Sequence, residues 1–196
     1  MFALVRPAVV STLFFTLLLG VAYPLAVTGI GQLAFPAQAG GSLVRDKAGQ
    51  VIGSRLIAQN FARPQYLRPR PSAAGADGYD AAGSSGSNLG PLNPALGERI
   101  GKAADELRAG DARAIPADAV TTSGSGLDPD VSPANARRQA ARIAAARGVA
   151  VGEIERVIAA HTRGPTLGLL GQPAVNVLET NLALDAAFPA AQLPAR

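Results

Sequence analysis

The chain has no cysteine, no tryptophan and a single histidine, His161, among its 196 residues. Without cysteine it can form no disulfide framework, no cysteine-ligated zinc site and no thiol nucleophile. One histidine excludes metal centres built from several imidazoles and leaves little room for a histidine-based catalytic triad. Charged residues make up only 16% of the chain, and a net charge of +4 does not by itself indicate binding to nucleic acid.

Sequence motifs of independent catalysis are missing as well. The chain contains no Gly-Lys-Ser/Thr phosphate-binding loop, no G-x-G-x-x-G dinucleotide fingerprint and no G-x-S-x-G nucleophile elbow. His161 follows an apolar helical segment, where a role in packing or at the negative end of the helix is expected. We therefore predict that the chain is not an enzyme on its own.

A long uncharged run lies near the N-terminus, between Arg6 and Arg45. Within it residues 8–33 are almost wholly apolar, and as a helix with a rise of ~1.5 Å per residue they would extend about 39 Å. That length is enough to cross a hydrocarbon core ~30 Å thick. We predict a membrane anchor over residues 1–39 with one transmembrane helix at about 8–33, kinked at Pro24 because proline lacks the backbone donor.

The alternative for this segment is a cleaved signal peptide. Ala37-Gln38-Ala39 before Gly40 has the small residues of a cleavage site, but a signal core is usually only ~7–15 residues long. The apolar run here is much longer, which favours an uncleaved anchor. The positive charge of Arg6 gives a weak preference for a cytoplasmic N-terminus.

Small residues on the predicted helix indicate a packing face. Ala22 and Ala26 lie four positions apart, a spacing that lets another helix approach closely. We predict that these two residues contact a partner helix, although small residues are also common in membrane spans that have no such partner.

The remaining residues, 40–196, are predicted to form one soluble domain. The predicted fold class is α+β, with a single N-terminal transmembrane helix followed by this small domain. Arg137, Arg138 and Arg142 on one helix are expected to form a solvated face; contact with acidic or phosphate groups is the alternative. The predicted elements are a hairpin with strands at 43–45 and 51–57, helices at 94–110, 133–147 and 152–161, and a strand at 175–177.

Two glycine- and serine-rich loops interrupt these elements, at residues 72–93 and 121–128. The second loop runs toward a helix start near Ser132, where backbone amides can hold an anion such as phosphate. The alternative is a tight loop in which Asp128 accepts hydrogen bonds from local amides. The candidate phosphate-contacting residues are Ser123, Gly124, Ser125, Gly126 and Asp128.

Four spaced motifs follow the predicted anchor. They are Arg70-Pro71-Ser72-Ala73, Ser84 to Pro91 with Asn93, Ser123 to Pro129 leading to Ser132-Pro133-Ala134, and Val175 to Glu179 with Asn181. Together with the anchor they resemble the KdpC family, the small subunit of bacterial Kdp potassium-transporting P-type ATPases, and the resemblance covers nearly the whole chain, in order. Asp130 is a departure, because histidine or asparagine is expected there more often in this family.

The resemblance implies a four-subunit complex for potassium uptake. A channel-like subunit binds the transported potassium, and a P-type ATPase subunit is phosphorylated on its own aspartate. The KdpC subunit is a catalytic chaperone that assembles the complex and raises the ATP affinity of the ATPase subunit, an effect tied to the Gly/Ser loop region. Ser84, Ser85 and Asn88 are accordingly predicted to contact partner subunits, and ATP is expected to act through the complex.

The expected location is the bacterial inner membrane, as a single-pass protein with a periplasmic soluble domain. ATP is scarce there, so the nucleotide effect would be indirect and the domain would cap the channel-like subunit near the potassium entrance. With the opposite orientation, direct nucleotide contact by Ser123–Asp128 becomes possible. Two other functions stay open: a membrane-tethered extracytoplasmic binding module unrelated to transport, and a secreted hydrolase with a cleaved signal.

Overall fold

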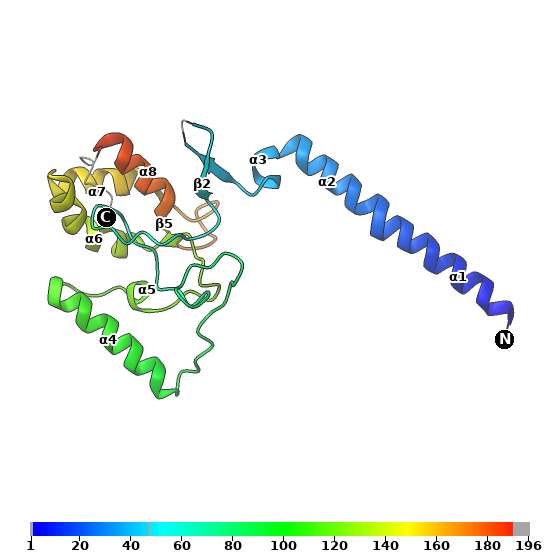
Figure 1. Ribbon diagram of the computed structural model, residues 1–196, viewed down its shortest axis with the longest axis horizontal. Helices are drawn as coiled ribbons and strands as arrows, with labels where there is room; N and C mark the ends of the chain where they lie inside the picture. Colours follow the sequence, from blue (N-terminus) through cyan, green and yellow to red (C-terminus); the bar gives the residue numbers. More distant parts are fainter. Residues whose placement is uncertain (1, 47, 190–196) are drawn as a thin grey trace. The chain divides into compact units, whose positions relative to one another are not determined.

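The computed structural model of the chain describes residues 2–46 and 48–189 (Figure 1). The chain divides into two compact units, residues 1–52 and residues 53–196, which are described separately below. The predicted boundary between an anchor of residues 1–39 and a domain of residues 40–196 stays a prediction. Lys47 and residues 190–196, which fall within that predicted domain, lie outside the described residues.

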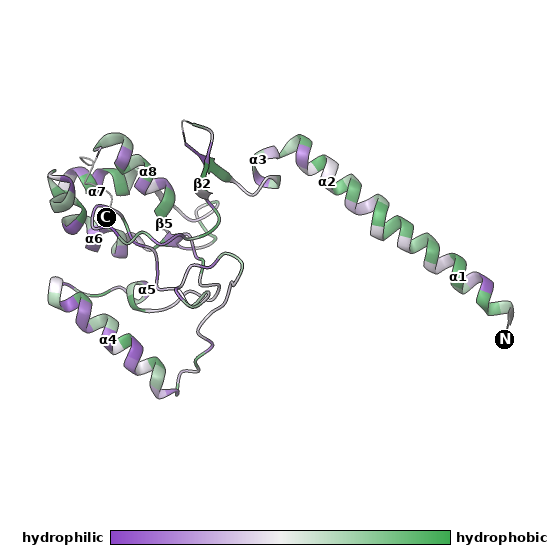
Figure 2. Ribbon diagram, in the orientation of Figure 1, coloured by the Kyte–Doolittle hydropathy of each residue, from purple (hydrophilic) through white to green (hydrophobic). Residues whose placement is uncertain are grey.

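The first unit contains a long apolar helical segment that fits the predicted membrane anchor. Residues Ala3–Ala34 form a candidate membrane span of 32 residues. Figure 2 shows apolar residues along most of its length. The long apolar helix predicted at about residues 8–33 is confirmed as part of a longer helical segment, and its bounds as a membrane span stay a prediction. The helices of this unit are α1 (Phe2–Leu17), the π-helix η1 (Leu18–Ala22), α2 (Tyr23–Ala34) and α3 (Pro36–Ala39).

The predicted effect of Pro24 takes the form of the π-helical turn η1 just before it. The N–H of Tyr23 donates to the carbonyl of Leu18, five residues earlier, instead of the carbonyl four residues earlier. Proline cannot donate, and its ring crowds the carbonyl four residues back. The wider turn is a known way to accommodate such a disruption while the helix continues.

A hairpin follows the span, as predicted. Strands β1 (Leu43–Arg45) and β2 (Val51–Ser54) form a two-stranded sheet, so β2 ends three residues earlier than expected. The Oδ1 atom of Asp46 accepts hydrogen bonds from the N–H groups of Ala48 and Gln50, at 2.8 and 2.9 Å. This arrangement explains the turn, because an aspartate side chain readily caps the backbone just after it.

The second unit combines five helices with a three-stranded antiparallel sheet of order β3-β5-β4 among the described residues. Asp130 pairs with Asn176, and Thr162 pairs with Val175, so β5 is the central strand. The elements are α4 (Pro94–Gly110), α5 (Ala117–Val120), β3 (Asp130–Val131), α6 (Pro133–Arg147), α7 (Val151–Ala160), β4 (Thr162–Arg163), β5 (Ala174–Asn176) and α8 (Val177–Ala187).

The apolar core of this unit lies between α6, α7, α8 and the sheet. The helices predicted at 133–147 and 152–161 are confirmed, and α6 begins after the Ser132 cap and ends at Gly148, whose φ of 68° suits glycine. The helix predicted at 94–110 is also confirmed, with Asn93 as its cap. The core residues are Leu67, Val131, Ala136, Ala140, Ile143, Ala144, Ile154, Ile158, Val175, Val177 and Leu184.

The strand predicted at residues 175–177 is only partly correct, because Val177 begins helix α8. The Asn176 side chain accepts a hydrogen bond from the N–H of Glu179 at 3.0 Å, which is an N-terminal helix cap. The alternation of Val175 and Val177 therefore reflects a strand end followed directly by a buried first helical turn.

The prediction of a solvated arginine face on α6 is wrong for two of the three residues. Arg137 is exposed, but Arg138 is buried and Arg142 is partly buried. Arg138 donates to the carbonyls of Leu107, Asp111, Arg113 and Ala114, and Arg142 donates to those of Pro64 and Tyr66. Most of these carbonyls lie in coil, outside any helix or sheet, so the guanidinium groups satisfy them. The carbonyl of Leu107, near the C-terminal end of α4, also accepts from the N–H of Asp111.

Arg147, the last residue of α6, holds three backbone segments together. Its side chain is fully buried and donates to the carbonyls of Gln65, Leu184 and Phe188. It also forms an ion pair with Asp185 at 2.8 Å and lies over the ring of Tyr66.

Replacing Arg147 should therefore destabilise the second unit strongly. Arg147→Met keeps the length of the side chain but removes a buried donor from three carbonyls and the cation that pairs with Asp185, and we expect a loss of about 3–5 kcal/mol. Thermal unfolding of the full chain followed by circular dichroism measures the effect. Arg137→Met on the same helix is the control and should leave the midpoint nearly unchanged. Equal midpoints for the two variants would contradict this role of Arg147.

Candidate functional site

The two glycine- and serine-rich loops meet in the structure, although they lie about forty residues apart in sequence. The Ser84 hydroxyl donates to the carbonyl of Ser125 at 3.0 Å. A Cβ atom on Gly86 would lie 2.8 Å from the carbonyl oxygen of Gly124. A Cβ atom on Gly126, whose φ is +68°, would lie 2.5 Å from the carbonyl oxygen of Ser85. Glycine is therefore required where the two loops touch, and we call this surface the loop junction: residues 84–86 and 123–126.

An ion pair lies beside the loop junction. The Arg70 guanidinium lies 3.0 Å from the Asp128 carboxylate, and both side chains are partly buried. Arg70 also donates to the carbonyl of Thr122 at 3.4 Å, and the N–H of Ser123 donates to the carbonyl of Pro71 at 3.3 Å. The first and third motifs of the sequence are thus directly bonded to each other.

The segment between Arg70 and the loop junction is ordered by Ser72 and Tyr79. The Ser72 hydroxyl oxygen accepts from the N–H of Tyr79 at 2.8 Å, and the Tyr79 hydroxyl donates to the carbonyl of Arg70 at 2.9 Å. Burial raises the pKa of Tyr79 above its ordinary value, so the hydroxyl stays protonated as the donor. The Ser72 hydroxyl, the Tyr79 hydroxyl and the Asp80 carboxylate each form hydrogen bonds within this glycine-rich segment.

Three backbone amides of Ser123–Asp128 are occupied by contacts within the loop, and contact of this loop with a phosphate stays a prediction. The N–H of Gly126 donates to the carbonyl of Ser123, that of Leu127 donates to the Ser125 hydroxyl, and that of Asp128 donates to the Ser123 hydroxyl. These amides are occupied within the loop, and the Asp128 carboxylate would repel an anion. Asp128 Oδ1 accepts from the N–H of Asp130 at 3.0 Å, which is the contact expected of a tight loop.

The N-terminus of α6 is also occupied. Asp118 accepts hydrogen bonds from the N–H and the hydroxyl of Ser132, both at 2.8 Å, and from the Asn135 side-chain amide at 3.0 Å. A carboxylate at this position already complements the positive end of the helix. Sequence reasoning missed Asp118, because its partners follow fourteen and more residues later in coil and in the next helix.

Asp130, the departure from the family pattern, forms contacts with two other residues of the second unit. It pairs with Arg163, and its Oδ1 atom accepts from the Asn176 side-chain amide at 3.2 Å. Burial raises the pKa of Asp130, while the nearby Arg163 charge lowers it. The carboxylate therefore links strands β3, β4 and β5 at their ends.

The remaining predicted contact residues are exposed. Ser85 and Asn88 lie on the surface of the 84–93 segment, and Asn88 adopts the left-handed conformation with a φ of 53°. Ala22 and Ala26 are exposed along the candidate span. Their roles toward partner subunits stay predictions, and the exposure leaves them accessible to a partner.

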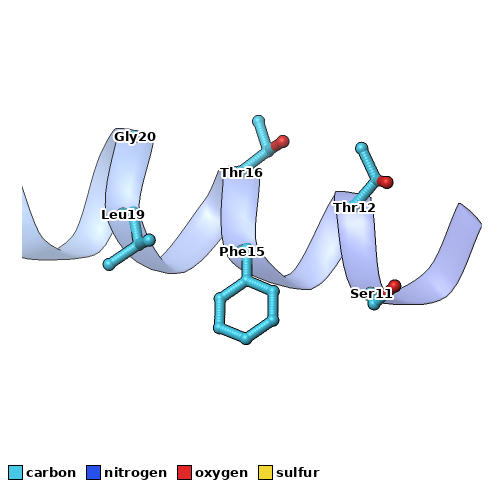
Figure 3. A pocket seen from close by; sticks show the side chains of 6 residues that line it. All are labelled: Ser11, Thr12, Phe15, Thr16, Leu19 and Gly20. Carbon is cyan, nitrogen blue, oxygen red and sulfur yellow. The ribbon is translucent and has the colours of Figure 1, made fainter. Parts of the chain in front are cut away.

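The candidate span also carries a shallow hollow that sequence reasoning did not single out. Figure 3 shows two rows of side chains along it, Thr12, Thr16 and Gly20 in one and Ser11, Phe15 and Leu19 in the other. The Ser11 hydroxyl bonds back to the carbonyl of Pro7 at 2.7 Å, which lets a polar side chain lie within an apolar helix.

A groove of about 610 Å³ lies in the second unit, between the coil of residues 60–71, the C-terminal part of α4 and α6. Arg68, Arg142 and Glu106 line it together with apolar side chains. Burial and the neighbouring Arg68 charge lower the pKa of Arg142 to about 10. Because Arg142 donates to Pro64, Tyr66 and Gln139, its charge serves to fix the wall of the groove.

The described residues combine a candidate membrane span with a small α+β domain. Two surface loops of this domain pack closely against each other at glycines, and these features define the class of the protein. The family model described as the c chain of the K+-transporting ATPase (KdpC) matches residues 5–186. The chain therefore belongs to the KdpC family, as the resemblance predicted. The candidate span and this family fit a single-pass membrane protein.

Individual relatives cover almost the whole chain. The chain is 64% identical over 186 residues to the potassium-transporting ATPase KdpC subunit of Caulobacter sp. (strain K31), with 94% of each chain covered. It is 57% identical over 193 residues to the KdpC subunit of Beijerinckia indica, with 97% of each covered. It is 51% identical over 185 residues to that of Geobacter sulfurreducens, with 94% of this chain and 98% of the relative covered.

The packing of the loop junction predicts different effects on stability for alanine at Gly126 and at Gly124. Gly126→Ala forces a side chain into the left-handed region and against Ser85 and Ala74, which should cost roughly 1–3 kcal/mol. Gly124→Ala meets nothing within 4 Å and should be nearly neutral. Thermal melts of the two full-chain variants compare them directly. If both alanines were tolerated equally, the two loops would not be packed as described.

Proposed function

We propose that this chain is a non-catalytic accessory subunit of a high-affinity, ATP-driven potassium uptake complex. Its role is to assemble or stabilise the complex and to raise the ATP affinity of the P-type ATPase subunit. Family membership supports the complex. The observation that carries the accessory role is the loop junction, where Ser84 bonds to Ser125 beside the Arg70–Asp128 pair and forms an ordered, exposed surface.

The loop junction has the properties of a docking surface. Its buried glycines and paired amides fix the backbone before any partner arrives, so little conformational entropy is lost on association. Ser84, Ser85, Gly124 and Ser125 remain exposed at its rim. Short side chains of this kind allow a partner backbone to approach closely, with hydroxyl groups available for hydrogen bonds.

The soluble domain is proposed to lie in the periplasm, where it caps the channel-like subunit near the potassium entrance. Arg6 at the N-terminal end of the span supports this orientation through the positive-inside rule. Ala22 and Ala26 are proposed to meet a helix of a partner subunit within the membrane. Potassium is bound by the channel-like subunit in this proposal, and ATP by the P-type ATPase subunit.

The effect on nucleotide affinity is proposed to be indirect. The amides of residues 126–128 are occupied, and Asp118 occupies the start of α6, so neither supplies free donors for a phosphate group. A subunit that binds one conformation of its partner more tightly than another shifts the population of that conformation, and so changes the affinity for a ligand bound elsewhere.

Substitution of Asp128, beside the loop junction, should matter more than substitution of the only histidine, His161. In purified complexes, Asp128→Ala removes the partner of Arg70, and we expect K+-stimulated ATP hydrolysis to fall roughly tenfold, or about 1.4 kcal/mol. His161→Ala removes a contact to the carbonyl of Val157 at 2.9 Å and should cost on the order of 1 kcal/mol of stability, with hydrolysis nearly intact. The opposite ranking would contradict the proposed surface, and hydrolysis by the chain alone would contradict the non-catalytic role.

The orientation has its own test, which exploits the lack of cysteine. Leu92 is 95% exposed, so a Leu92→Cys variant carries one accessible thiol. We expect a membrane-impermeant thiol reagent to label this site in intact spheroplasts of the bacterium. Labelling that requires membrane disruption would instead place the domain in the cytoplasm and make direct nucleotide contact the better proposal.

A further inference from the structure

A leucine-rich loop joins β4 to β5 and projects its side chains into solvent. Leu167 is 88% exposed, Leu169 is 86% exposed and Leu170 is 64% exposed. Single exposed leucines are ordinary on protein surfaces, but three within four positions form a contiguous apolar patch. We call residues 165–171 the leucine loop. The core of the second unit does not use these side chains.

Four backbone N–H groups of the leucine loop donate to carbonyls within the loop. The N–H of Thr166 donates to the carbonyl of Leu170 at 2.8 Å, and the N–H of Leu170 donates to the carbonyl of Thr166 at 3.0 Å. Gly168 donates to Pro165 at 3.0 Å, and Leu169 donates to Thr166 at 3.2 Å. Internal pairing removes the main penalty for moving a backbone out of water, because unpaired amides are costly in an apolar phase.

The conformation of Leu167 supports the same conclusion. Leu167 has a φ of 55° in the left-handed region, which is strained for a residue with a β-carbon. Glycine would fit this turn without strain, yet the sequence has leucine there with its side chain in solvent. The hydrogen bonds within the turn hold Leu167 in this conformation, and its side chain points away from the core with 88% of its surface exposed.

Charge is absent from this part of the chain. No Asp, Glu, Lys or Arg occurs between Arg163 and Glu179. Arg163 lies at the base of the loop, in β4, where it pairs with Asp130. The loop therefore presents an uncharged apolar tip, the composition required for burial in an apolar phase.

The connection to the candidate span indicates that the apolar phase is the lipid bilayer. Residues 35–52 join the candidate span to the second unit, which the chain enters at Gly53. The Asn176 side chain of β5 donates to the carbonyl of Arg55 at 3.0 Å, so the sheet that carries the leucine loop is bonded to the start of this unit. A short covalent tether makes contact with the bilayer an intramolecular event with a high effective concentration.

From these observations we propose that the leucine loop inserts Leu167, Leu169 and Leu170 into the headgroup–acyl boundary of the bilayer on the side where the soluble domain lies. The proposal rests on the membrane anchoring described above. It assigns the loop a second contact with the membrane, which limits rotation of the domain about its tether. Insertion to this depth needs only a few apolar side chains and no change of fold.

Site-specific fluorescence in proteoliposomes tests the proposal, since the chain has no native cysteine. The full chain carrying Leu169→Cys is labelled with an environment-sensitive dye and reconstituted into phosphatidylcholine–phosphatidylglycerol vesicles that contain lipids with a shallow spin-label quencher. The matched control is Leu92→Cys, a second highly exposed leucine site in a different loop. Thr16→Cys, within the candidate span, reports on anchoring.

We expect strong quenching at position 169 and little at position 92. Adding Leu167→Ser and Leu170→Ser to the Leu169→Cys chain should remove the quenching while the thermal midpoint stays unchanged. Quenching at position 16 but not at position 169 would overturn the proposal and leave the anchor intact. Shielding of position 169 from aqueous iodide only in the assembled complex would also overturn it, in favour of a partner protein. No quenching at position 16 would overturn the anchor and this proposal together.

Discussion

The second unit depends on arginine side chains of α6 that pair with the backbone carbonyls of coil. Residues 55–93, all of which the structure describes, contain neither helix nor strand. Their carbonyls therefore have no partners in a helix or a sheet. Arg142 donates to Pro64 and Tyr66, and Arg147 donates to Gln65. Asn181 of α8 adds two further bonds to the backbone of Leu67, at 2.7 and 2.9 Å. Because buried carbonyls must be paired, these contacts allow a long coil to be packed as a fixed layer.

The loop junction is built on this fixed layer. Leu67 is held by Asn181, Arg70 follows three residues later, and Arg70 then pairs with Asp128. Ser123 bonds to Pro71, so the second loop is aligned against the same stretch. Polar contacts therefore connect the core to the loop junction: Asn181 to Leu67, Arg70 to Asp128, and Ser123 to Pro71. A small alanine-rich core needs such contacts, since it buries little apolar area per residue.

Local signals in the sequence were enough to place the long helices. Asn93 and Ser132 cap α4 and α6, Pro94 and Pro133 follow them, and Gly148 ends α6; each acts through its own backbone geometry. The candidate span was equally clear, because the thickness of a bilayer sets a minimum length of apolar sequence.

Contacts between distant segments gave no such signal. The carbonyl partners of Arg138 lie 24 to 31 residues away and those of Arg142 lie over 70 residues away, so an arginine on the apparent polar face of a helix looked solvated. The two-residue strands β3 and β4 are too short to show an alternation. The meeting of Ser84 with Ser125 follows from tertiary packing alone. Resemblance to a family indicated which loops mattered, while physical reasoning from the residues alone left their arrangement open.

Helix α4 shows how the polar framework reaches beyond the core. Ala104 is its only buried residue, so apolar packing contributes little to its position. Arg138 pairs with the carbonyl of Leu107 near its C-terminal end, where a cation also complements the helix dipole. Near the other end, Arg99 donates to the Ser87 hydroxyl at 3.2 Å.

Ser87 directly follows the residues of the loop junction, so the position of α4 and the shape of that surface depend on one segment. A deletion within residues 84–86 would therefore move α4 as well as remove the surface, and its effect on transport could not be assigned to partner contact. Substitution of the exposed Ser85 side chain separates the two roles, because it changes what a partner meets and leaves the backbone path unchanged.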